Sequence, residues 1–159
     1  MIRMLYLISI LSWPLVSYAD VDLVKVDKSK RRMYLLDGQT VVQEYRIALG
    51  KNPQGHKFKE GDQRTPEGRY YLDYISNDSS YYRSVHITYP NHQDTVLAMK
   101  SGVNPGGDIK IHGLKNGFQV KPEFIQSFDW TDGCIAITND QVDDFLSRVK
   151  LGTPIVIEW

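Results

Sequence analysis

The sequence lacks a second cysteine, an excess of charge and a spaced set of metal ligands. Cys134 is the only cysteine among 159 residues, so the chain cannot form an internal disulfide. The 19 basic residues balance the 19 acidic ones, and without a basic excess we expect no binding to nucleic acid. One cysteine and four scattered histidines do not match the ligand spacing of a zinc site, so we predict neither a metal nor another cofactor.

Long apolar runs are also missing, except at the start of the chain. Arg3 precedes an almost unbroken apolar stretch over residues 4–16, and Ser17-Tyr18-Ala19 places small residues where a signal peptidase cleaves. We therefore predict a secretory signal peptide over residues 1–19 and one domain over residues 20–159, with no transmembrane segment after cleavage. An uncleaved N-terminal anchor is the alternative interpretation.

Alternating apolar and polar residues predict a mainly β (α+β) domain with one main helix near the C-terminus. Asp37-Gly38, between two such stretches, predicts a tight hairpin turn. Residues 50–68 are rich in turn-forming and charged residues, which predicts a long loop and a candidate lid over a cleft. A helix is expected after Asn139, a suitable N-cap, because the apolar residues that follow fall on one face. Strands are predicted over residues 21–26, 32–36, 40–49, 69–74, 84–89, 109–111, 135–138 and 154–159, the last as an edge strand.

The lone thiol of Cys134 is either a small buried hydrophobe or a nucleophile. A reactive cysteine needs a base, a group that orients the base, and donors for the oxyanion of a tetrahedral intermediate. His112, at the end of a predicted strand, could accept the thiol proton while its other ring nitrogen donates to the carbonyl of Gly113. The backbone N–H groups of Gly133 and Cys134 are candidate oxyanion donors. From spacing alone both interpretations stay open.

Several motifs resemble those of a known family. The pair His112-Gly113, followed by Thr131-x-Gly133-Cys134-Ile135, resembles the signature of L,D-transpeptidase (YkuD-type) catalytic domains, as does the upstream Thr65-Pro66-x-Gly68. The resemblance extends across nearly the whole of residues 20–159. The resemblance is closest to the YafK-like branch of murein L,D-transpeptidase-related proteins. That branch shares Glu60-Gly61-Asp62-x-Arg64, directly before Thr65-Pro66-x-Gly68.

The resemblance implies a β-sandwich of mixed sheets whose groove holds the cysteine and histidine and takes peptidoglycan stem peptides in the periplasm. Cys134 would be the nucleophile, forming a thioacyl-enzyme, with His112 the base and the Gly113 carbonyl its orienting group. Thr131, Asp132 and Gly133 would support the oxyanion site together with the Cys134 amide. One alternative is an L,D-hydrolase that releases a cross-link or a wall-attached outer-membrane lipoprotein. Another is a non-catalytic peptidoglycan-binding module.

Two positions depart from the commoner family pattern. Asp132 stands where many members have histidine, and we expect its charge to raise the pKa of the thiol unless the carboxylate is paired or turned away. Ala136 stands where arginine or asparagine is common, so a fixed cation is missing.

Other basic residues are weighed as contacts for the carboxylates of stem peptides. The basic cluster over residues 28–32 is interpreted as a solvated loop face, and His56 and His92 as solvent-exposed. Trp130 is expected to pack beneath the loop that leads to Cys134, the candidate nucleophile. The candidates for binding these carboxylates are Arg64, Arg83, Lys100 and His86. For the three cations the alternative is solvation or a structural ion pair. For His86 the alternative is a structural position within a strand.

Overall fold

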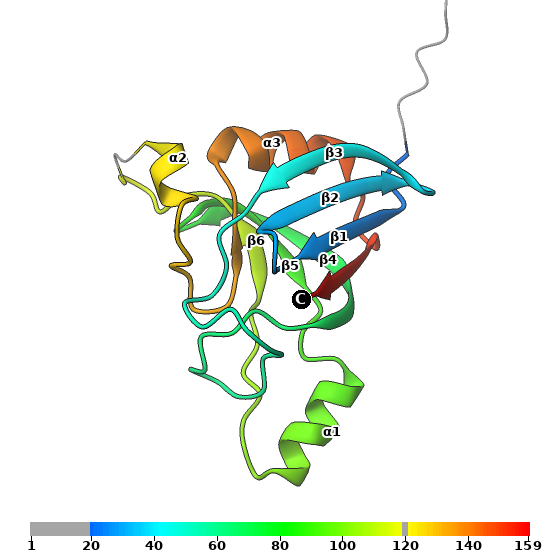
Figure 1. Ribbon diagram of the computed structural model, residues 1–159, viewed down its shortest axis with the longest axis vertical. Helices are drawn as coiled ribbons and strands as arrows, with labels where there is room; N and C mark the ends of the chain where they lie inside the picture. The colour runs from blue at the N-terminus through cyan, green and yellow to red at the C-terminus, as the bar shows by residue number, and fades with distance from the viewer. Residues whose placement is uncertain (1–19, 119–120) are drawn as a thin grey trace, which may run out of the picture.

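The computed structural model describes residues 20–118 and 121–159, so the predicted signal peptide over residues 1–19 lies outside the described residues. In this range the chain forms eight strands and three helices (Figure 1). None of the helices in the described ranges has the length and apolar character needed to cross a membrane.

The N-terminal part of the sheet is an antiparallel meander of β1 (Leu23–Asp27), β2 (Arg32–Asp37) and β3 (Thr40–Arg46). Asp37 pairs with Thr40, so the two turn residues are Gly38 and Gln39, one position later than predicted. Gly38 adopts a φ of 59°, a left-handed conformation that favours glycine. The hairpin itself is confirmed.

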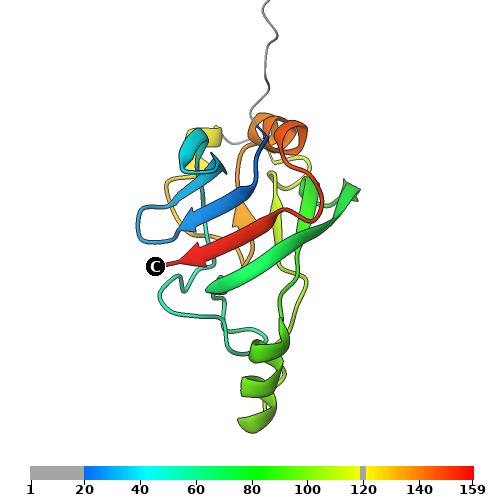
Figure 2. The same cartoon turned by 90° about the vertical axis from the view of Figure 1, so that its right-hand side faces the viewer.

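The C-terminal strand β8 (Pro154–Glu158) is central in the sheet, and the prediction of an edge strand is wrong. It pairs parallel with β1 and antiparallel with β4 (Gly68–Ser79), in the strand order β3-β2-β1-β8-β4-β5-β6-β7. Figure 2 shows β8 between its two partners. Pro154 is tolerated because it occupies the first position of the strand, where its missing N–H breaks no interior hydrogen bond.

Strand β4 joins the two halves of the sheet. Its first residues pair with β8, while Leu72 and the residues after it pair with β5 (Tyr82–Ile87). Strands β6 (Lys110–His112) and β7 (Ile135–Ala136) follow. The remaining predicted strands are therefore confirmed, with ends that differ by a few residues.

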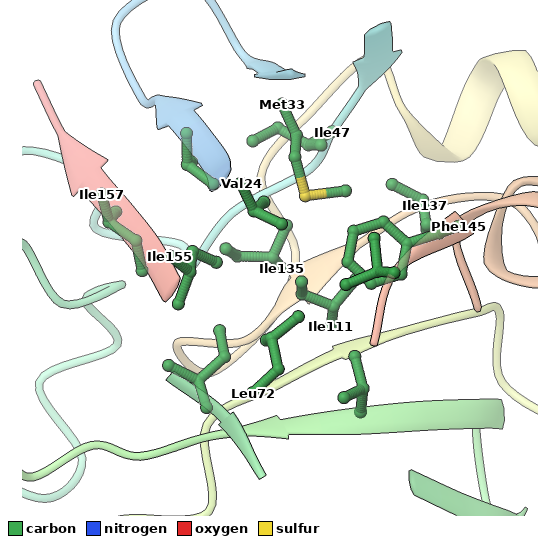
Figure 3. Close-up of a cluster of buried hydrophobic side chains, with 14 of the residues drawn as sticks. Val24, Met33, Ile47, Leu72, Ile111, Ile135, Ile137, Phe145, Ile155 and Ile157 are labelled. Carbon is green, nitrogen blue, oxygen red and sulfur yellow. The ribbon is translucent and has the colours of Figure 1, made fainter. Parts of the chain in front are cut away.

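The two ends of the sheet meet, and the core lies between its halves. Ala48, just after β3, and Ala136 in β7 exchange two backbone hydrogen bonds of 2.9 Å. Figure 3 shows side chains of β1, β2 and β8 meeting those of β4, β6 and β7. The mostly β fold is confirmed, and its two expected layers are halves of one eight-stranded sheet.

The helix α3 (Asn139–Arg148) follows β7 as predicted, but its N-cap is Thr138. The Thr138 hydroxyl accepts from the backbone N–H of Gln141, and the Gln141 side chain returns a bond to the Thr138 N–H. Asn139 instead accepts a hydrogen bond from the backbone N–H of Leu114. Phe145 of α3 is buried in the core.

Two further helices were not predicted, α1 (His92–Lys100) and the short α2 (Pro122–Ile125). Helix α1 extends away from the sheet in Figures 1 and 2 and buries only Asp94 and Ala98, so it has no continuous apolar face to reveal it. The sequence feature that could have predicted this helix is the capping box formed by Asn91 and Asp94.

Candidate active site

Cys134 and His112 line the same open cavity, which has a volume of about 550 Å³. The cavity is bordered by the end of the β4–β5 hairpin, by β6 and by the loop before β7. Its lining comprises Lys51, Ser76, Asp78, Ser79, Ser80, Tyr81, Asp108, Lys110, His112, Trp130, Thr131, Asp132 and Cys134.

His112 ends strand β6, and a single hydrogen bond sets the role of its ring. Its Nδ1 lies 2.7 Å from the carbonyl oxygen of Gly113. Because a carbonyl oxygen only accepts, Nδ1 carries the hydrogen, and in the neutral ring Nε2 is the nitrogen with a lone pair. Burial lowers the pKa of His112, so the neutral form prevails near pH 7. The predicted hydrogen bond from the His112 ring to the Gly113 carbonyl is present.

Two aromatic rings flank the imidazole. The Tyr81 ring centroid lies 4.7 Å from that of His112, and the Trp130 ring meets His112 edge-on at 5.8 Å. The sequence predicts Trp130 beneath the loop that leads to Cys134, and the structure shows that its ring packs against His112. The rings cover part of the imidazole, and His112 as a residue is 5% exposed.

Gly113 admits no side chain, because a Cβ would lie 2.5 Å from the Asn139 side-chain oxygen and 2.9 Å from the Cβ of Tyr82. Its N–H donates to the carbonyl of Tyr81 at 3.1 Å. The glycine after the histidine therefore lets strand β6 lie close to α3 and the β4–β5 hairpin.

Cys134 directly precedes β7, which runs parallel to β6 with Ile111 opposite Ile135 and His112 opposite Ala136. Continuing this register places Cys134 beside Lys110. Since side chains alternate along a strand, Cys134 and His112 project from the same face as diagonal neighbours, whose Cβ atoms are on the order of 7 Å apart.

In the described part of the chain no hydrogen bond joins the two side chains, and the Cys134 Sγ lies 3.7 Å from the carbonyl oxygen of Asp108. Burial raises the pKa of the thiol. The resting pair is therefore a neutral thiol and a neutral imidazole, in place of a preformed thiolate. Catalytic hydrogen bonds of this kind often shorten only when substrate is bound.

The loop before Cys134 is held by Thr131. The buried Thr131 hydroxyl donates to the Cys134 carbonyl at 2.7 Å and accepts from the Gly133 N–H at 3.1 Å. The Gly133 N–H is therefore engaged, and the predicted pair of oxyanion donors is reduced to the Cys134 N–H, which has no acceptor in residues 20–118 and 121–159.

Gly133 is required for close packing against the neighbouring loop. It adopts a φ of 133°, and a Cβ there would lie 2.7 Å from the carbonyl oxygen of Arg64. The loop before Cys134 thus rests directly on the segment that contains the Thr65-Pro66 element. Thr65 also accepts a hydrogen bond of 3.1 Å from the Gly50 N–H.

Two buried lysines organise the loop over residues 50–68. Lys28 is fully buried and donates 2.8 Å hydrogen bonds to the carbonyls of Gly55 and Thr65 and to the carboxylate of Glu67. Lys57 forms a buried ion pair of 2.9 Å with Asp62. The interpretation of Lys28 as part of a solvated face is wrong, and the loop is internally braced.

His56 is also bound within this region rather than simply exposed. Its Nδ1 accepts from the Glu67 N–H at 3.0 Å, so the hydrogen is on Nε2, which faces the Asp94 carboxylate at 3.2 Å. His92 is exposed at the start of α1, as predicted.

Asp132 is paired. Its carboxylate lies 2.9 Å from the Nζ of Lys51 and 3.1 Å from the side-chain nitrogen of Gln63, and the hydrogen bond from Lys51 lowers its pKa. This pairing reduces the expected increase in the pKa of the thiol. The charge of Asp132 still contributes to the raised pKa of Cys134.

None of the four predicted substrate-binding residues lines the cavity. Arg83 forms an ion pair of 2.6 Å with Asp143. His86 lies 2.7 Å from Asp73 and stacks on Tyr74 with centroids 4.6 Å apart. Lys100 ends α1, and Arg64 lies in the loop that supports Gly133.

The cations that do line the cavity are Lys51 and Lys110. Lys110 pairs with Asp108 at 2.7 Å. It could have been identified from the sequence, because it lies two residues before His112 in a strand and so projects from the same face. Lys51 is brought in by the bridge between Gly50 and Thr131, for which the sequence has no local signal.

Comparison with known proteins gives one family. The model of the L,D-transpeptidase catalytic domain (YkuD) matches residues 22–157. A search of curated proteins gave no match.

Among solved structures, the helical cell shape determining protein Pgp2 from Campylobacter jejuni is 28% identical, with a TM-score of 0.64, over 87% of this chain and 47% of that one. Bd1075 from Bdellovibrio bacteriovorus is 22% identical with a TM-score of 0.59, over 89% and 48% of the two chains. An L,D-transpeptidase C442S mutant from Enterococcus faecium is 15% identical with a TM-score of 0.57, over 87% and 50%. The last two likenesses concern the fold alone. This chain spans about half the length of each of these proteins.

Proposed function

This chain belongs to the L,D-transpeptidase catalytic domain family, and we propose that it is an exported, cysteine-dependent acyltransferase that acts on peptidoglycan stem peptides in the periplasm. The signal peptide over residues 1–19 is part of the proposal, as is a single catalytic domain over residues 20–159. The similar Campylobacter protein is described as a helical cell shape determinant, which supports a role in wall remodelling. Membership of the YafK-like branch stays a prediction.

The proposed reaction begins with proton transfer from the Cys134 thiol to Nε2 of His112. The sulfur attacks the carbonyl carbon of an L-centre joined to a D-residue, and a C–S bond forms while the carbonyl oxygen becomes an oxyanion. The Cys134 N–H donates to that oxyanion. When the C–N bond breaks, His112 returns the proton to the departing amine, and a thioester on Cys134 remains.

The observation that carries this proposal is the bond between the Nδ1 of His112 and the carbonyl of Gly113 at 2.7 Å, in a cavity that also holds Cys134. It fixes the tautomer in which Nε2 accepts a proton. A histidine placed only for packing would not need that bond beside the only cysteine of the chain. The lowered pKa of His112 suits a base that must be unprotonated at neutral pH.

The thioester can be resolved by an amine, which is transpeptidation, or by water, which is hydrolysis. A hydrolase that releases cross-links or a wall-attached lipoprotein would use the same first step. The proposal therefore requires an experiment that identifies the products as well as the nucleophile.

Purified protein is incubated with isolated sacculi, and the released and remaining muropeptides are identified by mass spectrometry. We expect new L,D-linked or exchanged products from the wild type and none from Cys134→Ala or His112→Ala. His92→Ala, a change at an exposed histidine, serves as the matched control and should retain activity. A carbapenem should add its mass to the wild type but not to Cys134→Ala.

The products separate the alternatives. Cleavage without exchange assigns the hydrolase. Tight binding to sacculi with an unreactive Cys134 assigns a non-catalytic wall-binding module and overturns the proposal.

A further inference from the structure

A second, apolar cavity of about 240 Å³ adjoins the cavity of Cys134. It lies beside the α2 region and is not needed for the steps proposed above. Its lining comprises Tyr81, Leu114, Lys115, Phe118, Ile125, Phe128 and Trp130.

The two cavities share a wall. Tyr81 and Trp130 line both, and their ring centroids are 6.1 Å apart. The same two rings flank His112, at 4.7 and 5.8 Å. A molecule that contacts the catalytic imidazole therefore lies next to the entrance of the apolar cavity.

The chemistry of the reaction decides which part of a substrate lies there. His112 must return its proton to the departing amine, so that amine has to lie within hydrogen-bond reach of Nε2. The residue that carries the amine then lies over Tyr81 and Trp130, beside the apolar cavity. An incoming amine that resolves the thioester takes the same position, because the second step reverses the geometry of the first.

The lining selects the kind of side chain that can enter. Phe118 and Phe128 are 52% and 46% exposed, and an apolar group bound in the cavity would reduce the exposure of both side chains. A volume of about 240 Å³ is far more than a methyl group fills. Lys115 is the one charged residue of the lining and has no ion pair among the described residues, so a cationic side chain is disfavoured.

We propose that this cavity is a specificity site for the amine component of the reaction, the residue on the leaving or incoming side of the bond, and that it takes a large apolar side chain. The inference rests on the proposed function, because it uses the direction of proton transfer by His112. It adds the class of residue that the enzyme prefers to release or attach.

The test uses synthetic stem peptides that differ only in the residue after the scissile bond, which is D-alanine, D-phenylalanine or D-lysine. We expect kcat/KM for the D-phenylalanine peptide to exceed that for the D-alanine peptide by about tenfold, the usual scale of discrimination by an apolar pocket. The D-lysine peptide should gain nothing over D-alanine. Equal or lower kcat/KM for D-phenylalanine overturns the proposal.

Substitutions in the cavity test whether its residues cause the preference for D-phenylalanine. Phe128→Ala and Phe118→Ala should each reduce the ratio of D-phenylalanine to D-alanine by several fold, and the exposed side chains make both changes tolerable for folding. Phe58→Ala is the matched control, since Phe58 is also partly exposed but lies outside this cavity, and its ratio should equal that of the wild type. A ratio that stays at the wild-type value in both cavity variants overturns the assignment.

A binding measurement separates failure of the site from failure of the proposed function. The Cys134→Ala protein is titrated with millimolar D-phenylalanine and D-alanine, and NMR shifts of the aromatic side chains are followed. Saturable shifts with D-phenylalanine that Phe128→Ala removes support the cavity, even if no peptide is cleaved and the proposed function has failed. The absence of such shifts, together with no preference in turnover or no turnover at all, overturns the inference.

Discussion

The hydroxyl of Thr131 donates a hydrogen bond of 2.7 Å to the carbonyl oxygen of Cys134, three residues further along the chain. The Thr131 hydroxyl oxygen also accepts a hydrogen bond of 3.1 Å from the Gly133 N–H. One buried hydroxyl thus closes the loop that carries Cys134, the proposed nucleophile, and leaves the Cys134 N–H available to an oxyanion. The threonine of the motif acts by positioning the loop.

Replacing Thr131 with valine keeps the shape of the side chain and removes both bonds. Because the Gly133 N–H and the Cys134 carbonyl lose a buried partner, the free energy of unfolding should fall by about 1–3 kcal/mol. The turnover of muropeptides should fall more steeply than the stability predicts. Urea unfolding and product formation are measured in parallel.

Thr131→Ser is the matched variant for this prediction. It keeps the hydroxyl and loses one methyl group, which should cost about 1 kcal/mol or less, and its kcat should stay close to that of the wild type. If serine and valine reduce kcat equally, the hydroxyl has no positioning role.

The second prediction concerns Lys28, which holds the loop over residues 50–68 in place. Lys28→Met leaves the carboxylate of Glu67 and two backbone carbonyls without their donor, so the free energy of unfolding should fall by roughly 3 kcal/mol. Proteolytic cleavage should appear first within this loop. Lys30→Met, two residues away, is the control: its side chain is exposed and pairs with Asp27 at the surface, so the change should lower the free energy of unfolding far less than Lys28→Met does and leave cleavage of the loop unchanged.

The mostly β fold and the core of the site could be predicted because their signals are local. Strand alternation identified the eight strands, and two short motifs identified His112, Gly113 and Cys134. The bond from His112 to Gly113 followed from adjacency in the chain. What joins these parts is non-local, and there the predictions failed.

The failures share this cause. Lys51 reaches the cavity only through the pairing of Gly50 with Thr131, and Lys28 is buried only because the loop folds over it. The strand at the C-terminus is central because a parallel pairing joins it to β1, the first strand of the chain. The ion pair of Arg83 with Asp143 likewise joins residues far apart in the chain and has no local signal in the sequence.

The acidity of the two proposed catalytic groups, His112 and Cys134, gives a third prediction. Burial lowers the pKa of His112 from its ordinary 6.5 and raises that of Cys134 from its ordinary 9.0. Activity that needs the neutral imidazole should therefore persist below pH 6.5 and fall only at lower pH. Alkylation of Cys134 by iodoacetamide should rise with pH and have its midpoint above pH 9.0.

Free N-acetylcysteine, alkylated in the same buffers, is the reference for the second half of this prediction. A midpoint for Cys134 below that of the reference would indicate a preformed thiolate–imidazolium pair and contradict the neutral resting state. His112→Ala should leave the midpoint high while it removes turnover.

Lys110 is the cation closest in register to Cys134, and its charge acts on both members of the pair. It favours the thiolate and disfavours the imidazolium, so it partly offsets the effect of burial on the thiol. Lys110→Met should therefore slow alkylation of Cys134 at a fixed pH by about threefold, and it should shift the alkylation midpoint upward.

The prediction depends on charge at this position rather than on net charge or on shape. Lys110→Arg keeps the cation beside Asp108 and should restore most of the alkylation rate. Lys100→Met removes one positive charge from the end of α1, outside the cavity, and should leave the rate unchanged. If Lys100→Met slows alkylation as much as Lys110→Met does, the effect comes from the overall charge of the protein, and Lys110 does not tune the thiol. If all three variants react at the wild-type rate, the neighbouring Asp108 already cancels the charge of Lys110, and Lys110 does not set the acidity of Cys134.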